Sequence, residues 1–205
     1  MSDDHCTIHM FDGSVYRCRM TLKALKKQLN EGFMEVKRGC MIAVSAISDI
    51  GDKILLSNGE EICYTKRKKK ALREELQKKQ ELMIAKISKK KLPLTPEEYG
   101  KYYKICDSLP FAFTDIEMVF NEEKKAVDWI FRYGNEALAT LEKLPLDKMI
   151  GNSFSSLFSN MDAKWLHVYE RATLYGETLE IMDYSPEIDT NLKIICFPTF
   201  PGHCG

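Results

Sequence analysis

A cluster of cations lies where the local sequence pattern changes. Thr65-Lys66-Arg67-Lys68-Lys69-Lys70 follows a short strand-like segment and precedes a long stretch with helical spacing. Backbone N–H groups at a helix start favour an anion, so cations there destabilise the helix when nothing is bound. A phosphate at this point would relieve the repulsion and accept hydrogen bonds from free N–H groups. The cluster therefore favours nucleic-acid binding over the simpler alternative, a solvated helix face.

The charge distribution along the chain agrees with this interpretation. The first 91 residues carry 20 Lys and Arg against 12 Asp and Glu, whereas the remainder carries 10 against 18. A second basic pair, Lys37-Arg38, precedes Gly39, where the backbone can approach a ligand closely. The net charge of zero thus hides a basic part, which we expect to have an anionic partner, and an acidic part without one.

Motifs for catalysis or metal binding are sparse. There is no P-loop, no G-x-G-x-x-G, no H-E-x-x-H and no G-x-S-x-G. His203-Cys204 lies at the C-terminus, where a rigid nucleophile–base geometry is hard to hold, and a loop or truncated strand is the simpler interpretation. His5 and His9 are expected on the solvent side of a strand, where a metal site lacks further obvious ligands. We therefore expect no enzyme, no metal and no cofactor.

The cysteines and the hydropathy pattern indicate a compartment. The seven cysteines are scattered, odd in number and without a C-x-x-C pair, which is typical of reduced thiols in a cytosol. The longest apolar runs have four or five residues, against the roughly 20 that span a bilayer. The N-terminus has neither the basic stretch nor the apolar core of a secretory signal. We expect a cytoplasmic protein without a membrane partner.

Short strands are expected in the first 65 residues. Cys6, Ile8 and Met10 alternate with polar residues, and Asp12-Gly13 and Asn58-Gly59 are hairpin signals. Thr21 is expected to cap a short helix. Further strands are predicted at residues 15–19, 33–36, 41–44, 47–50, 53–56 and 61–64.

From residue 66 the apolar spacing becomes helical. One stripe on a helix of about 20 residues is formed by Leu72, Leu76, Met83 and Ile87. The heptad spacing of Leu76 and Met83 permits a dimerising coiled coil, although Lys79 interrupts the seam. The helix is expected to end at residues 89–93, where three lysines and a proline oppose its continuation.

The second half begins with a helix-start signal. Thr95-Pro96-Glu97-Glu98 is a capping box with proline at the first helical position. One side of the helix that follows is expected to carry Tyr99, Tyr102, Tyr103 and Cys106. Beyond Pro110 we predict strands at 112–120 and 127–133, short helices at 135–159, a helix at 162–174, and strands near 178–184 and 191–198.

Four groups of residues in the first part carry a family resemblance. They are Thr21-Leu22-x-x-Leu25, Phe33 with Arg38 and residues 42–44, Asn58-Gly59, and Thr65-Lys66-Arg67 at the helix start. In this pattern the chain, over about residues 1–76, resembles the LytTR family of DNA-binding domains. The resemblance implies an all-β domain with short helices that reads double-stranded DNA from three loops. The family usually has strand material before residues 3–5, so we expect an unprotected sheet edge here.

The resemblance also implies which residues contact DNA. The three loops correspond to His5, to the Lys37-Arg38 turn, and to Arg67 with its neighbours. Arg67 is the candidate for a bidentate contact with a guanine edge. Phosphate contacts are expected from Lys66, Lys68, Lys69 and Lys70. His5 would donate to a base or a phosphate, or simply be solvated.

The second half resembles a PAS domain. The resemblance lies in residues 129–158, with N-E-A at a helix start, I-G-x-S-x-x-x-L-F further on, and Asn135 and Gly151 at the characteristic places. It implies an α+β sensor or dimerisation domain with an antiparallel sheet. Candidate pocket residues are Trp129, Phe131, Phe154 and Trp165, although aromatic residues at such spacing also form plain core. PAS sheets usually close with one further strand, and we expect the chain to stop, at Cys204-Gly205, before that strand.

These observations predict three parts: a LytTR-like DNA-binding domain at residues 1–72, a helical linker at 73–107 and a PAS-like domain at 108–205. We expect a homodimeric transcription regulator in which an unknown small-molecule or protein signal acts on the PAS-like part. That part would bias DNA binding through the linker helix. One alternative is a non-catalytic signalling or dimerisation protein whose LytTR-like part no longer binds DNA. Another is RNA binding by the lysine-rich helix alone.

Overall fold

The computed structural model describes residues 5–10, 12–90, 94–159, 162–186 and 188–205. The chain divides into two compact units, an N-terminal unit (residues 1–80) and a C-terminal unit (residues 81–205). Helix α2 (Lys69–Lys90) contributes residues to both. No helix among the described residues is long and apolar enough to cross a membrane.

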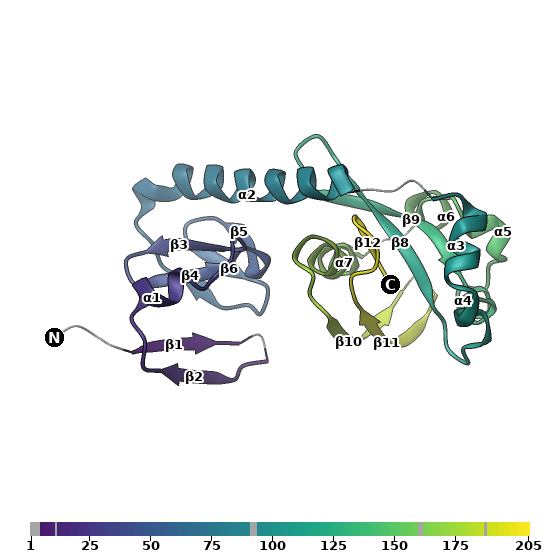
Figure 1. The fold of residues 1–205 in the computed structure, drawn as a ribbon, viewed down its shortest axis with the longest axis horizontal. Coiled ribbons are helices and arrows are strands. Elements are labelled where there is room, and N and C mark those ends of the chain that lie inside the picture. Colours follow the sequence, from purple (N-terminus) through teal and green to yellow (C-terminus); the bar gives the residue numbers. More distant parts are fainter. Residues whose placement is uncertain (1–4, 11, 91–93, 160–161, 187) are drawn as a thin grey trace. The chain divides into compact units, whose positions relative to one another are not determined.

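The N-terminal unit consists of short antiparallel strands and one short α-helix before α2 (Figure 1). β1 pairs with β2, β3 pairs with β4, and β5, β6 and β7 form a three-stranded sheet. The bounds are β1 (Cys6–His9), β2 (Val15–Cys18), α1 (Leu22–Lys26), β3 (Phe33–Lys37), β4 (Cys40–Ala43), the 3-10 turn η1 (Val44–Ala46), β5 (Ile47–Ile50), β6 (Ile54–Leu56) and β7 (Glu61–Ile62). Every strand predicted for this region is present, and β7 is two residues shorter than expected.

Local signals explain several of these elements. The Thr21 side chain accepts a hydrogen bond from the Ala24 N–H and caps α1, as predicted. Gly39 and Gly59 have φ of +80° and +85°, so each hairpin turn uses the backbone freedom of glycine. The sheets enclose a core of fully buried apolar side chains, among them Met34, Val36, Val44, Ile50 and Ile54.

The first turns of α2 are anchored in the N-terminal unit. The 3-10 turn η2 (Lys66–Lys68) leads into the helix, and Leu72 is buried. Arg73 Nε donates to the Ile50 carbonyl at 2.8 Å, and Lys79 Nζ donates to the Glu31 carbonyl at 2.8 Å. Lys79, which interrupts the possible coiled-coil seam, thus has a partner in its own unit. Of the predicted stripe only Leu72 is buried; Leu76, Met83 and Ile87 are half-buried.

Residues 91–93 of the C-terminal unit lie outside the described residues, and so does part of the predicted helix end. The capping box at Thr95 forms as predicted. The bounds are α3 (Pro96–Tyr102), the 3-10 turn η3 (Lys104–Ser108), β8 (Thr114–Phe120), β9 (Ala126–Gly134), α4 (Glu136–Glu142), α5 (Leu146–Met149), α6 (Phe154–Leu157), α7 (Ala163–Tyr175), β10 (Leu179–Ser185), β11 (Thr190–Cys196) and β12 (His203–Cys204). This is the predicted order of elements, with one strand added.

The added strand corrects the expectation of a missing closing strand. β12 pairs with β8, and β8 pairs with β9. On its other side, Gly205 and Phe197 exchange two backbone hydrogen bonds, and Pro198 bridges to Cys204. β12 therefore lies between β8 and the end of β11, the partner of β10. Gly202, with φ of +88°, allows the reversal that brings so short a strand into the sheet.

The core of the C-terminal unit lies between this antiparallel sheet and the helices. Helix α7 contacts β8, β9, β11 and β12, and α6 contacts β9. The buried apolar cluster contains Ile116, Met118, Trp129, Phe131, Leu138, Met149, Phe154, Trp165, Ala172, Cys196 and Cys204. A sheet covered by short helices and one longer helix is the α+β arrangement that the sequence predicted.

Candidate functional sites

The cations at the start of α2 are presented on a short, tight turn. Lys66, Arg67 and Lys68 form η2, where the Lys68 N–H donates to the Thr65 carbonyl at 2.8 Å. All three side chains are exposed, and no described residue pairs with any of them. Neither η2 nor the first turn of α2 contains an acidic residue. The turn therefore combines exposed positive charge with the N–H groups of a helix start.

The next two lysines differ in having acidic neighbours. Lys69 Nζ lies 3.7 Å from an Asp52 oxygen, and Lys70 Nζ lies 3.9 Å from Glu74. Both pairs are solvent-exposed, so each contributes little to stability. The five cations that form one run in the sequence thus fall into two groups. Three have no acidic partner among the described residues, and two have an acidic neighbour.

Lys37 and Arg38 lie at the β3–β4 turn. Lys37 is the last residue of β3 and pairs with Cys40 across a register shift, and Arg38 and Gly39 form the turn. The two basic side chains are exposed. They project from a hairpin end whose strands are fixed by the buried side chains of Met34 and Val36.

His5 is exposed and immediately precedes β1. Because Cys6 pairs with Cys18, His5 is at the same hairpin end as Arg17 and Arg19, which are also exposed. Sequence reasoning missed both arginines. The available signal was that the two arginines flank Cys18 on a predicted strand and therefore lie on the same face of that strand.

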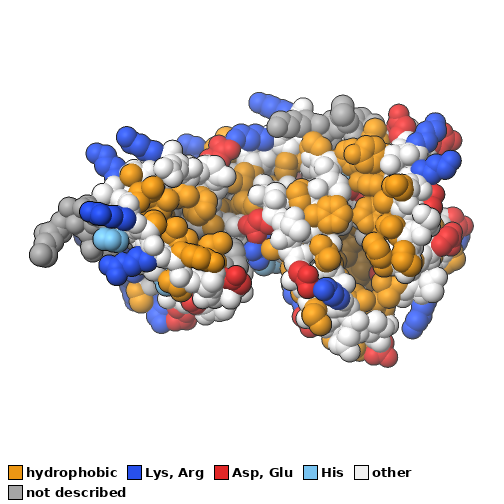
Figure 2. Space-filling model, turned by 60° about the horizontal axis from the view of Figure 1, so that its bottom comes forward, with side chains coloured by type: hydrophobic (Ala, Val, Ile, Leu, Met, Phe, Trp, Pro, Cys, Tyr) orange, Lys and Arg blue, Asp and Glu red, His pale blue; other side chains and the backbone are white. Residues whose placement is uncertain are grey.

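These segments share one end of the N-terminal unit. In Figure 1 the start of β1, the end of β3 and the start of α2 all lie at that end. Figure 2 shows Lys and Arg side chains, with a histidine, around the same end. We name this surface the basic end; it comprises His5, Arg17, Arg19, Lys37, Arg38, Lys66, Arg67, Lys68, Lys69 and Lys70. A surface of this kind attracts an extended anion.

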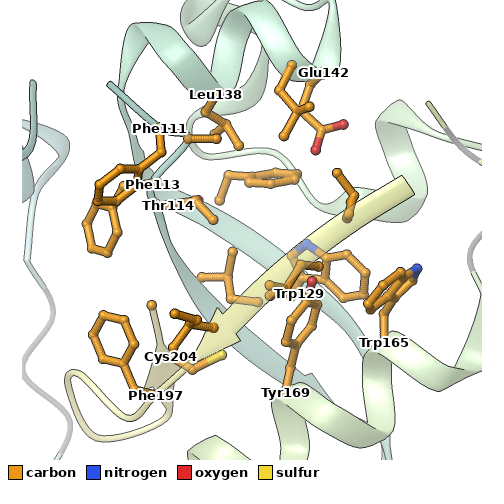
Figure 3. A pocket seen from close by; sticks show the side chains of 18 of the residues that line it. Phe111, Phe113, Thr114, Trp129, Leu138, Glu142, Trp165, Tyr169, Phe197 and Cys204 are labelled. Atoms are coloured by element: carbon orange, nitrogen blue, oxygen red, sulfur yellow. The ribbon is translucent and has the colours of Figure 1, made fainter. Parts of the chain in front are cut away.

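The C-terminal unit contains a cavity of about 850 Å³. This volume lies within the range of small-molecule pockets, about 300–1,000 Å³. The four aromatic residues proposed from the sequence, Trp129, Phe131, Phe154 and Trp165, all contribute to its lining. Further lining residues that sequence reasoning did not single out include Phe111, Phe113, Leu138, Tyr169, Phe197 and Cys204 (Figure 3). Figure 2 shows hydrophobic side chains gathered around a hollow in this unit.

The polar atoms of the cavity wall are few. Thr114 lines the cavity, but its hydroxyl donates to the Tyr133 carbonyl at 2.7 Å. Glu142, at the end of α4, directs its carboxylate inward in Figure 3. Lys193 of β11 is a further charged residue in the lining. A cavity with mainly aromatic walls and a few charged groups suits an apolar molecule with a polar end.

A buried polar network lies beside the cavity. Asp115 is completely buried, and its carboxylate accepts hydrogen bonds from the Tyr103 hydroxyl at 2.8 Å and the Thr199 hydroxyl at 2.5 Å. His203 Nδ1 contacts the same carboxylate at 2.6 Å, and the Tyr99 hydroxyl lies 3.4 Å from His203 Nε2. Burial and the Asp115 carboxylate raise the pKa of the Tyr103 hydroxyl far above its usual value. The network ties α3 to β8 and β12.

His203-Cys204 forms the short strand β12, and a truncated strand was one of the simpler interpretations considered from the sequence.

The predicted aromatic face of α3 is split, because Tyr99 and Tyr103 are buried whereas Tyr102 is 65% exposed. In α7, burial raises the pKa of Glu170 to about 7. No group of three or more His, Cys, Asp or Glu side chains among the described residues is placed to hold a metal ion.

Residues 1–77 match the family model of the LytTr DNA-binding domain. The match confirms the resemblance predicted for the N-terminal part, and it covers less than half of the chain. It does not extend into the C-terminal unit, where PAS-like identity stays a prediction. No curated protein and no solved structure matches the chain.

Proposed function

We propose that this chain is a transcription regulator that binds double-stranded DNA through the basic end of its N-terminal unit. The observation that carries this proposal is the coincidence of the LytTr family match with exposed cations at the start of α2 that have no partner among the described residues. A DNA partner requires a compartment that holds DNA, and we propose the cytoplasm. The proposal involves no catalytic step and no cofactor.

The residues at the basic end have distinct proposed roles. Arg67 is central in the unpaired trio, and its planar guanidinium suits a bidentate contact with guanine O6 and N7. Lys66 and Lys68 flank it and are placed to contact phosphates, which fix position and carry no sequence information. His5, directly before β1, and the Lys37-Arg38 turn, at the end of β3, provide two further contact points.

Fluorescence anisotropy with a labelled pool of random-sequence DNA duplexes tests this proposal. The variant with Lys66, Arg67 and Lys68 all changed to Ala is expected to bind at least tenfold more weakly than the natural chain. The matched control changes Lys101, Lys104 and Lys148 to Ala, three exposed lysines of the C-terminal unit. This control alters net charge equally and is expected to retain affinity. Equal losses in both variants, or no binding at low salt, would contradict the proposal.

We further propose that the C-terminal unit is a PAS-like sensor that binds a small apolar molecule in its cavity. The order of elements, including the closing strand β12, supports this. Asn135 also supports it: the side chain is buried, caps α4 through the Leu138 N–H, and donates to the Cys106 and Phe111 carbonyls. Every polar atom of this side chain is thus used to join η3 and residue 111 to the helices.

Intrinsic fluorescence provides a direct test, because both tryptophans of the chain line the cavity. Titration with 1-anilinonaphthalene-8-sulfonate, an apolar fluorophore with one anionic group, is expected to quench tryptophan emission and saturate. Ala112→Phe, a substitution in the lining, is expected to abolish saturable quenching. The control Val127→Phe lies outside the lining on an exposed strand position and should not. Indistinguishable behaviour of the two variants would count against a ligand-binding cavity.

Coupling between the two units and dimerisation complete the proposal. We propose that α2, a continuous helix of 22 residues with residues in both units, carries the effect of a ligand to the basic end.

We also propose a homodimer, supported by the outer face of β10 and β11, where Met182, Tyr184 and Ile195 are exposed. Light scattering of the natural chain and of Met182→Asp is expected to give a dimer and a monomer, respectively.

A further inference from the structure

Two cysteines face each other at the base of the first hairpin. Cys6, the first residue of β1, is the direct cross-strand partner of Cys18, the last residue of β2. Directly opposed residues of an antiparallel pair point to the same face, with Cα atoms about 4.5 or 5.5 Å apart. Both separations fall within the range of about 4.4–6.8 Å found across disulfides. The two thiols are free in this structure.

The surroundings of the two thiols differ. Cys6 is 8% exposed, and its Sγ donates to the Met20 carbonyl at 3.0 Å. Burial raises the pKa of the Cys6 thiol, and the neighbouring Cys18 thiol raises it further. Cys18 is half-exposed. Because oxidants react with accessible thiolates, Cys18 is the thiol that reacts first and Cys6 is the resolving thiol.

We propose that Cys6 and Cys18 are a modification site at which a peroxide forms a reversible intramolecular disulfide. The Cys18 thiolate attacks one oxygen of hydrogen peroxide, the O–O bond breaks, and hydroxide leaves and takes up a proton to become water. The resulting sulfenic acid sulfur is attacked by the Cys6 thiolate, an S–S bond forms, and a second water leaves. Two thiols thus lose two electrons and two protons, and one peroxide is reduced to two waters.

The remaining cysteines are less suited to this chemistry. Cys196 and Cys204 are close enough for their thiols to form a hydrogen bond, but each is only 1% exposed in the core. Cys40 lies in β4 opposite Lys37, Cys63 follows β7, and Cys106 lies in η3, so none of the three has a cysteine as cross-strand partner. The Cys6–Cys18 pair therefore combines opposition across a hairpin with access for the oxidant.

The disulfide has a structural consequence at the basic end. It removes the proton that Cys6 donates to Met20, and it covalently closes the hairpin end that carries His5 and Arg19. Oxidation therefore changes the position or freedom of residues placed at the basic end. An effect on DNA affinity rests on the proposed function, whereas disulfide formation does not.

The test maps thiols in the full-length chain and needs no DNA. The protein is treated with hydrogen peroxide, free thiols are blocked with iodoacetamide, and peptides from a non-reducing digest are identified by mass spectrometry. The expected result is one disulfide between Cys6 and Cys18, with two fewer alkylated thiols per chain, both restored by dithiothreitol. The control Cys63→Ser changes an exposed thiol outside the pair and is expected to give the same map.

Two further variants keep the result interpretable. Cys18→Ser and Cys18→Ala should leave Cys6 alkylatable after peroxide, with circular dichroism confirming that the chain is folded. Alkylation of both Cys6 and Cys18 after peroxide would overturn the proposal. A first disulfide between Cys196 and Cys204, or one between two chains, would also overturn it. DNA anisotropy of the oxidised and reduced chain is recorded separately, so absence of DNA binding does not obscure the thiol map.

Discussion

The start of α2 and the core-facing surface of the C-terminal unit differ in whether their cations have acidic partners. In the N-terminal unit, Lys66, Arg67 and Lys68 project into solvent without a described partner. In the C-terminal unit, by contrast, Arg132 contacts Glu117 at 2.6 Å, and Arg171 contacts Glu177 at 2.6 Å. Cations that have acidic partners stabilise their own fold, whereas unpaired cations at a helix start weaken it. Whether a cation has an acidic partner therefore distinguishes structural charges from charges available to a ligand. The number of charged residues in a unit does not make this distinction.

The two units also differ in what they bury. Among the described residues, the fully buried side chains of the N-terminal unit, such as Val36 and Ile54, are apolar. The C-terminal unit buries Asp115 and His203 beside an apolar cavity. Burying such groups is costly unless their hydrogen-bonding capacity is satisfied. The contrast agrees with the two proposals, DNA binding on the surface of one unit and ligand binding inside the other.

Removal of Asp115 should give the largest effect on stability. Asp115→Ala leaves Tyr103, Thr199 and His203 without their shared acceptor, and we expect a loss of about 3–5 kcal/mol in the free energy of unfolding. Urea denaturation measures it. The control Glu180→Gln breaks the exposed pair with Lys193 and should cost less than about 1 kcal/mol. Similar losses in the two variants would erase the contrast between buried and exposed charge.

The pH dependence of stability provides a second test of the contrast between buried and exposed charged groups, through Glu170. Its pKa is raised to about 7 in the folded chain, so between pH 4.5 and 7 the folded state holds a proton that the unfolded state has released. Stability from this group is therefore lost as pH rises through that window, by up to about 3 kcal/mol. Glu170→Gln should lose this dependence in urea denaturation across pH 5–8, whereas exposed Glu97→Gln should keep it. Parallel pH profiles for Glu170→Gln and the natural chain would contradict the expectation.

Two cations of the same run should differ in their effect on DNA binding. Arg67→Ala removes an unpaired guanidinium and is expected to weaken affinity for a preferred DNA sequence by about 1–3 kcal/mol. Lys70, whose side chain is 90% exposed, already has Glu74 nearby, and Lys70→Ala should cost less than about 1 kcal/mol. Anisotropy titrations at one salt concentration compare them. A larger loss for Lys70→Ala would mean that pairing does not identify the contacting residues.

Short-range motifs were predictable from the sequence. The Thr95 capping box, the Thr21 cap and the Asn58-Gly59 turn each depend on residues within a few positions of one another. The turn from residue 65 to residue 70 was found because its charges coincide with a change of periodicity. Such signals do not require knowledge of the fold.

Contacts between distant segments were not predictable. Asp115 and His203 are 88 residues apart and meet only because β12 joins β8. A strand of two residues is too short to show a period of two, so β12 was missed. Trp129 and Phe154 have the same sequence spacing whether they fill a core or line a cavity. Only the packing of the helices on the sheet decides between these.

The salt dependence of DNA binding tests the central claim most directly. Anisotropy titrations of the natural chain with duplex DNA over a range of salt concentrations yield the slope of log K against log salt. Each phosphate neutralised at the basic end should contribute about −0.9, so several contacts predict a steep slope. Changing Lys66, Arg67 and Lys68 to Ala should flatten it by about two to three units. A slope near zero, or one that the triple substitution leaves unchanged, would contradict DNA binding at the basic end.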